Sequence, residues 1–183
     1  MKKYIRDYVF LIVVATIIVV LDQWTKQLVR TLIPFGGSWT PWPWLAPYAR
    51  IVHWQNTGAA FGMFQSLGWV FAILAFLVSI AILYYFPRVP RSEWAMRLAM
   101  MMQLGGAVGN LIDRLTQGTV TDFISVGTFA VFNVADASIS VGTVILVLAV
   151  WISDRKQKRL AEVNKEQVST IAEPPDSENR PVE

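Results

Sequence analysis

The sequence contains no cysteine and only one histidine, His53. The absence of cysteine excludes disulfide bonds and thiolate chemistry. A single histidine argues against a structural zinc site, which takes four Cys or His ligands. Neither a P-loop nor a dinucleotide-binding glycine motif occurs. The sequence therefore predicts no metal and no cofactor.

Charged residues are also scarce, since they make up 16% of the 183 residues, whereas 54% are hydrophobic. The mean hydropathy of +0.44 is typical of membrane proteins. Four apolar runs, counted with their polar ends, can each supply the roughly 20 residues with which a helix crosses about 30 Å of hydrocarbon. We therefore expect an all-α integral membrane protein, a four-transmembrane-helix bundle in a single domain over residues 1–153. Its spans cover approximately residues 8–28, 67–86, 96–112 and 134–153.

The basic residues are distributed unevenly around these runs. Twelve of the 16 lysines and arginines precede the first run, join the second to the third, or follow the fourth. By the positive-inside rule, both termini are cytoplasmic and residues 31–66 and 113–133 lie outside. This asymmetry accounts for the net charge of +3 without a nucleic-acid partner. The four basic residues on the outer side are Lys26, Arg30, Arg50 and Arg114.

Both ends of the chain bear on this topology. The N-terminal segment has the basic and apolar regions of a signal peptide, but no small-x-small cleavage site follows them, so we expect it to be retained as the first span. The C-terminal segment 154–183 is polar and highly charged. We expect it to be a disordered cytoplasmic tail.

The two outer segments differ in character. Residues 39–47 are rich in Trp and Pro, as in a chain that lies along the headgroup region. Residues 51–64 predict a strand followed by a turn of small residues. Residues 114–136 alternate apolar and polar side chains around Gly127, which predicts a small β-hairpin.

Outside the cytoplasmic segments the chain has four acidic residues: Asp22, Asp113, Asp122 and Asp136. In the predicted topology all four lie at the outer ends of spans or in the loop that joins two of them. Ionisable groups within a membrane are candidates for a functional site, because burying them is costly. The clustering of these acids at one depth therefore predicts a site near the extracytoplasmic face.

Two of the four acids have a structural interpretation. Asp22 and Lys26 are four residues apart on a helix and can form an ion pair. Asp113 shares a helix face with Asn110 and is followed by Arg114, whose charge favours the ionised carboxylate. The neighbouring glycines 105, 106 and 109 favour close packing against another helix.

Asp122 and Asp136 have no basic partner close in sequence. If the hairpin turns near Gly127, Asp122 lies opposite the residues just before Asn133. Two neighbouring carboxylates cannot both ionise easily, so such a pair shares a proton. One can then act as a base toward water and the other as an acid, as in aspartic proteases. Asn133 can cap the fourth helix, and Asp136 near its third position is the better candidate for the ionised base.

Other chemistries remain open on the residues alone. A Ser–Lys dyad would have to use Lys26, and a Ser–His pair would depend on His53. A small proton- or ion-coupled transporter could use the clustered aspartates as a relay, although a relay needs acids spread across the bilayer. A non-catalytic assembly or lipid-binding protein would not need two unpaired acids.

Five segments resemble the lipoprotein signal peptidases, the type II signal peptidases of bacterial membranes. They are DQWTK (22–26), QNTGAAFG (55–62), GGAVGNLIDR (105–114), VTDF (120–123) and FNVAD (132–136). The resemblance implies an aspartyl endopeptidase without a metal, in the bacterial inner membrane. Such an enzyme cleaves a prolipoprotein before its diacylglyceryl-modified cysteine and is inhibited by globomycin. The catalytic pair implied is Asp122 and Asp136.

The resemblance also implies a fold and supporting residues. The fold is a four-helix bundle with a small extracytoplasmic β-element and an interfacial loop, and we expect a monomer in contact with membrane lipid. The stretch between VTDF and FNVAD is shorter than is usual in the family, and the density of Trp and Pro in residues 39–47 is atypical. The supporting residues are Asp22, Lys26, Asn56, Gly58, Asn110, Asp113, Arg114 and Asn133.

Overall fold

The structure is a computed structural model that describes residues 2–58 and 67–172. The chain divides into two compact units, Met1–Leu146 and Val147–Glu183. The long helices are α1 (Lys2–Leu32), α2 (Gly68–Tyr85), α3 (Trp94–Gln117) and α4 (Val134–Ala172), and the strands are β1 (Ser38–Trp39), β2 (Ala49–Asn56) and β3 (Val120–Val126). The expected combination of a helical protein with a small β-element is therefore confirmed.

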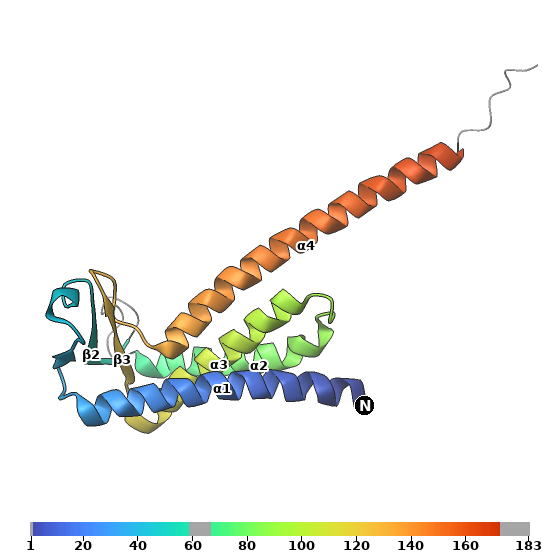
Figure 1. Ribbon diagram of the computed structural model, residues 1–183. Coiled ribbons are helices and arrows are strands. Elements are labelled where there is room, and N and C mark those ends of the chain that lie inside the picture. The colour runs from blue at the N-terminus through green and yellow to red at the C-terminus, as the bar shows by residue number, and fades with distance from the viewer. Residues whose placement is uncertain (1, 59–66, 173–183) are drawn as a thin grey trace, which may run out of the picture. The chain divides into compact units, whose positions relative to one another are not determined.

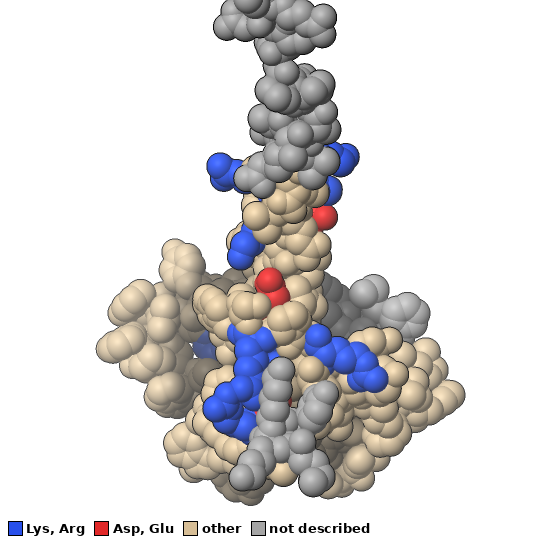
Figure 2. Space-filling view, turned by 90° about the vertical axis from the view of Figure 1, so that its right-hand side faces the viewer, with Lys and Arg blue, Asp and Glu red and all other residues tan. Residues whose placement is uncertain are grey.

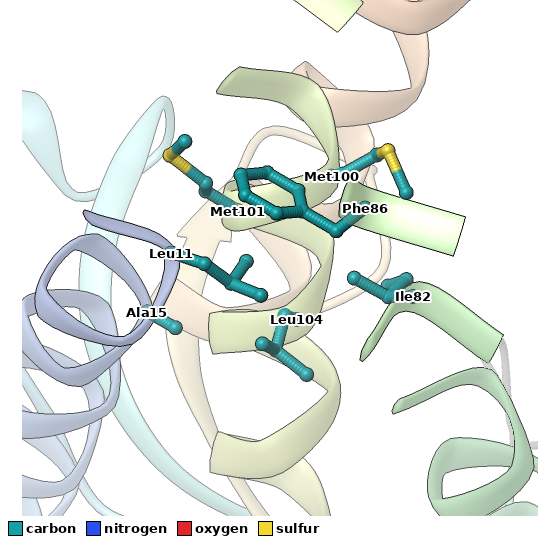
Figure 3. Packing of buried hydrophobic residues seen from close by; sticks show 7 residues of the cluster. All are labelled: Leu11, Ala15, Ile82, Phe86, Met100, Met101 and Leu104. Carbon is teal, nitrogen blue, oxygen red and sulfur yellow. The ribbon is translucent and has the colours of Figure 1, made fainter. Parts of the chain in front are cut away.

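Within the first unit, α1, α2 and α3 lie side by side, and α3 packs against both of the others (Figure 1). The three helices are joined by a cluster of buried apolar side chains (Figure 3). These side chains come from α1, from α3, from the end of α2 and from the turn that follows α2. Between membrane helices, close van der Waals packing of such side chains is a main source of attraction. The cluster consists of Leu11, Ala15, Ile82, Phe86, Met100, Met101 and Leu104.

Glycines allow two helices to approach α3 closely. A Cβ at Gly105 would lie 2.7 Å from Cβ of Ile18 on α1, and a Cβ at Gly106 would collide with the backbone oxygen of Ala135 at the start of α4. The close packing predicted from these glycines is therefore confirmed, and it is the small-residue packing common between membrane helices.

The helices expose much apolar surface. Two helical segments of the described chain, Gly68–Arg88 and Val134–Lys165, are long and apolar enough to cross a membrane. On α1, Val9, Val13 and Ile17 are each about half exposed at successive turns. Large contiguous apolar surfaces on a folded protein indicate contact with a membrane or a partner.

The three strands form an antiparallel sheet in the order β1-β2-β3. β2 confirms the strand predicted from residue 51, whereas residues 59–64 of the predicted turn lie outside the described part of the chain. Residues 114–136 do turn at Gly127, which has a φ of 52°, and Ile124 forms a single bridge with Phe132. The main partner of β3 is β2 rather than the return arm of a hairpin, because β2 pairs along β3 from Val126 to Val120.

Helix α4 continues beyond the predicted end of the fourth span at residue 153 and reaches Ala172. Residues 154–172, expected as part of a disordered tail, are helical in the structure. Their sequence contains no Pro or Gly and is rich in Lys, Arg, Glu, Gln and Ala, which are strong helix formers. The rest of the predicted tail lies outside the described residues.

Candidate active site

Asp136 lies in the first turn of α4, where it forms a reciprocal cap with Asn133. The backbone N–H of Asp136 donates to Oδ1 of Asn133 (2.9 Å), and the backbone N–H of Asn133 donates to Oδ2 of Asp136 (3.2 Å). This is the capping-box arrangement, in which residues at the cap and three positions later satisfy each other's N–H groups. The predicted cap is confirmed, and it fixes the carboxylate at the positive end of the helix dipole.

Asp122 is 1% exposed on β3, directly opposite Trp54 of β2. Its Oδ1 accepts a hydrogen bond from Nδ2 of Asn133 (2.7 Å), and its Oδ2 accepts one from Nδ2 of Asn56 (3.0 Å). Asn56 in turn accepts a bond from the backbone N–H of Gly58 (2.9 Å). Asp122 is therefore held from both sides, by the end of β2 and by the cap of α4.

Two amide side chains connect Asp122 to Asp136. Asn133 donates to Asp122 and also to Oδ1 of Asn110 on α3 (3.2 Å). Asn110 donates from its Nδ2 to Oδ1 of Asp136 at 2.7 Å. Because each amide side chain contacts three other polar groups, the positions of the two carboxylates depend on the same pair of asparagines.

A buried ionic cluster lies behind these amides. Nζ of Lys26 is 2.8 Å from Oδ2 of Asp22, 3.2 Å from Oδ2 of Asp113 and 2.9 Å from Oδ1 of Asn110. Lys26, Asp22 and Asp113 are all fully buried. The predicted Asp22–Lys26 pair is confirmed. The partners of Asp113, however, are Lys26 and Arg30 (3.8 Å) rather than the adjacent Arg114, because successive residues of a helix point in different directions.

The same cluster holds the elements that present the two candidate aspartates. Oδ1 of Asp22 accepts from the backbone N–H of Ala135 (2.9 Å), and Oδ2 of Asp113 accepts from the backbone N–H of Thr121 (2.9 Å). Ala135 directly precedes Asp136, and Thr121 directly precedes Asp122. The two structural aspartates are thereby linked to the backbone beside the two candidate catalytic ones.

The sequence interpretation missed Gln23. Its Nε2 lies 3.1 Å from Oδ2 of Asp22, 3.0 Å from the backbone oxygen of Gly109 and 3.1 Å from Oδ1 of Asp113. Gln23 lies in the DQWTK segment, but only the fold shows that its side chain joins α1 to α3. A Cβ at Gly109 would lie 2.7 Å from Oδ2 of Asp22, so this glycine leaves room for the cluster.

Asp122 and Asp136 line one cavity of about 420 Å³, which we call the aspartate pocket. Asn56, Gly58 and Arg114 add polar groups, and the remaining wall is almost entirely apolar. Nη2 of Arg114 is 3.5 Å from the backbone oxygen of Gly58, and its charge attracts both carboxylates. The apolar part of the wall consists of Phe71, Phe129, Ala130, Val131, Phe132, Ala137 and Val141, with Ser140 among them.

The environment of Asp122 favours its protonated form. Burial raises the pKa of Asp122 to about 7, and the nearby Asp136 carboxylate acts in the same direction. Hydrogen bonds from Asn56 and Asn133 and the charge of Lys26 oppose this rise. Near neutral pH Asp122 is therefore divided between its acid and its carboxylate form, as a carboxyl that transfers protons should be.

The geometry disfavours the other chemistries. Lys26 is engaged with two carboxylates, which argues against a Ser–Lys dyad. Nδ1 of His53 contacts the backbone oxygen of Ile33 (2.8 Å), and His53 is not among the residues that line the aspartate pocket. The four aspartates belong to one connected network rather than to a series along the helices. No group of three or more His, Cys, Asp or Glu in the described parts of the chain could hold a metal ion.

Most of the chain matches one family of known proteins. Residues 14–152 match the family model described as Signal peptidase (SPase) II. The chain is 38% identical over 151 residues to the lipoprotein signal peptidase of Halalkalibacterium halodurans, covering 80% of this chain and 95% of that protein. It is 39% identical over 155 residues to that of Mesorhizobium japonicum, covering 82% and 88%.

Solved structures give the same result. One bacterial membrane enzyme, determined by the in meso method, matches with a TM-score of 0.74 and 31% identity, over 81% of this chain and 91% of that one. A second bacterial membrane enzyme matches with a TM-score of 0.69 and 31% identity, over 77% and 92%. The resemblance seen in the five sequence segments is confirmed.

Proposed function

Because the chain belongs to the signal peptidase (SPase) II family, we propose that it is a membrane aspartic endopeptidase that removes the signal peptide from prolipoproteins, with Asp122 and Asp136 as its catalytic pair. One observation carries the assignment of the pair. The two carboxylates line the same pocket, and Asn133 and Asn110 connect them. Asp22 and Asp113, by contrast, pair with Lys26, and Asp113 also pairs with Arg30.

In the proposed reaction Asp136 is the base. Its carboxylate takes a proton from a water molecule as the water oxygen bonds to the scissile carbonyl carbon. Asp122, in its acid form, donates a proton to the carbonyl oxygen, which gives a neutral tetrahedral intermediate. When this intermediate collapses, the C–N bond breaks, Asp136 gives its proton to the leaving amine, and Asp122 recovers its own. The raised pKa of Asp122 supports this division of roles.

The other residues position this pair. Asn110 and Asn133 orient the carboxylates, Asn56 orients Asp122, and Gly58 lies beside Arg114 at the pocket wall. Arg114 attracts both carboxylates and so stabilises the negative charge as it passes from Asp136 to Asp122. The cluster of Asp22, Lys26 and Asp113 is the scaffold that carries these groups, and hydrogen bonds within it count for more because water is excluded.

The proposed topology has four spans, with both termini in the cytoplasm and the aspartate pocket near the extracytoplasmic face. The distribution of basic residues and the apolar surface of α1 support it. A diacylglyceryl-modified cysteine can then enter from the lipid, with cleavage before it, and the largely apolar pocket wall suits such a substrate. We propose that the enzyme acts as a monomer and is inhibited by globomycin.

The test is cleavage of a synthetic diacylglyceryl-cysteine precursor peptide by the purified protein in detergent, with and without globomycin. Asp122→Asn and Asp136→Asn should each lower kcat by about a hundredfold to ten-thousandfold, as expected when an acid or base of a proton-transfer pair is lost. Asp154→Asn is a matched control, because Asp154 is more than half exposed on α4. Near-normal cleavage by either variant would overturn the assignment.

A further inference from the structure

A second pocket lies at the other end of the bundle. It has a volume of about 400 Å³ and is lined by Arg6, Asp7, Phe10, Arg91, Trp94 and Arg97. Asp7 and Asp22 are 15 residues apart on α1, so about 22 Å of helix separates this pocket from the ionic cluster. Figure 2 shows lysine and arginine side chains gathered over this end of the bundle. We call it the basic pocket.

One buried carboxylate organises the basic pocket. Asp7 is 5% exposed, and its Oδ1 is 2.9 Å from Nε of Arg91 and 2.7 Å from Nη2 of Arg97. Arg97 also donates to the backbone oxygen of Val89 (2.9 Å) and lies over the ring of Phe86 at 4.1 Å. Arg97 is therefore a structural group. The side chain of Arg91 is 35% exposed, so it faces solvent as well as Asp7.

The residues that line the pocket carry more positive than negative charge. Three arginines line it against one aspartate, which gives a net charge of +2 for the six lining residues. Arg6 is exposed on α1 one residue before Asp7. Basic pockets between membrane helices on the cytoplasmic side bind the headgroups of anionic lipids. The charge of the basic pocket therefore suits a phosphate group.

Two aromatic residues indicate that the phosphate belongs to a lipid. Trp94 is 70% exposed and Phe10 is 57% exposed. Exposed Trp residues at the ends of membrane helices lie at the level of the headgroups. Phe10 is one helical turn from Arg6 toward the middle of α1, so the pocket has a charged outer part and an apolar inner part. A free phosphate ion would use only the first of these.

We infer that the basic pocket binds one anionic glycerophospholipid, with its phosphodiester against Arg6 and Arg91 and its acyl chains against Phe10. The site is separate from the aspartate pocket, so lipid binding there does not depend on the proposed proteolytic activity. By joining α1 to the start of α3 through a bound molecule, the lipid adds to the link that Asp7 already makes.

The test is native mass spectrometry of the full chain released from detergent micelles that contain palmitoyl-oleoyl phosphatidylglycerol or the matching phosphatidylethanolamine. The protein should retain one phosphatidylglycerol with at least about fivefold higher apparent affinity, since each basic residue near an anionic lipid contributes about 1 kcal/mol. Arg6→Gln should weaken this binding about fivefold, and Phe10→Ala should weaken it as well.

Arg88→Gln is the matched control. It removes the same charge at the same end of the bundle, but Arg88 contacts Tyr84 and does not line the pocket. It should leave phosphatidylglycerol binding unchanged, as should Asp122→Asn. Equal losses in Arg6→Gln and Arg88→Gln would overturn the proposal, because binding would then follow surface charge alone. Displacement of the lipid by millimolar inorganic phosphate, or equal retention of the two lipids, would also overturn it.

Discussion

Nδ2 of Asn133 lies 2.7 Å from Oδ1 of Asp122. Asp122 is on β3, whose strand partner is β2. Since Oδ1 of the same asparagine caps α4 at Asp136, one side chain both starts the helix and positions the opposing carboxyl. The two roles of Asn133 can be separated experimentally.

Asn133→Ser should keep the cap and lose the link to Asp122, because serine is a good cap but too short to reproduce the amide contact. We expect kcat to fall about a hundredfold, the usual cost of misplacing a reacting group by about 1 Å. The thermal midpoint in detergent should change little. Asn133→Ala should show the same loss of activity and an additional loss of about 1 kcal/mol in stability. Wild-type kcat in Asn133→Ser would show that the contact with Asp122 is not used.

Lys26→Met should destabilise the protein strongly. It leaves Asp22 and Asp113 buried without their shared cation, and breaking a buried ion pair costs about 3–5 kcal/mol. Thermal unfolding in detergent measures the effect. Lys158→Met is the comparison, because Lys158 pairs with Asp154 on an exposed surface, where ion pairs contribute little. A similar thermal midpoint for both variants would contradict the structural role of the cluster.

The pH dependence of cleavage should report on Asp122. Its pKa is raised to about 7, and in the proposed reaction it is the acid, so its active form should be lost as the pH rises. We therefore expect kcat/KM to fall above pH 7, by about tenfold per unit well above the pKa. A profile that rises through pH 8 would assign the acid role to another group.

Asn56→Ala should move this descending limb to higher pH. The hydrogen bond from Asn56 lowers the pKa of Asp122, so its removal lets the pKa rise further. Gln55→Ala is the neighbouring control, since Gln55 is exposed on β2 and makes no such contact. If kcat/KM fell at the same pH in both variants, Asn56 would not act through Asp122.

Gly109→Ala should lower both stability and activity. The added Cβ would lie 2.7 Å from Oδ2 of Asp22, and overpacking of a buried site costs about 1–3 kcal/mol. Leu115→Ala, at a largely exposed position of the same helix, should change neither. Wild-type stability in Gly109→Ala, measured by thermal unfolding, would mean that α1 and α3 can separate without cost.

Features of the site that depend on local spacing could be predicted from the sequence. Asp22 and Lys26 are four residues apart and Asn133 and Asp136 are three apart, so helix geometry alone brings each pair together. The pairing of β3 with β2 could not be predicted, because the pattern of residues 114–136 is compatible with either partner. The bond from Ala135 to Asp22 joins residues 113 positions apart, and no sequence periodicity encodes such a contact.

The C-terminal end of α4 could not be predicted for a different reason. Charge and polarity in residues 154–172 indicate an exposed segment, but they do not distinguish a solvated helix from a disordered chain. The helix propensities of the same residues favour the helix, which the structure contains. Composition therefore predicted the wrong conformation for residues 154–172.

The bond from Ala135 to Asp22 also determines when the site can form. Asp22 is synthesised early in translation. Its Oδ1 can accept the hydrogen bond from the backbone N–H of Ala135 only after the start of α4 has been synthesised. A nascent chain that ends at residue 131 already contains Asp122 but lacks Asn133 and Asp136. The proposed catalytic pair is therefore incomplete until the start of α4 has been synthesised.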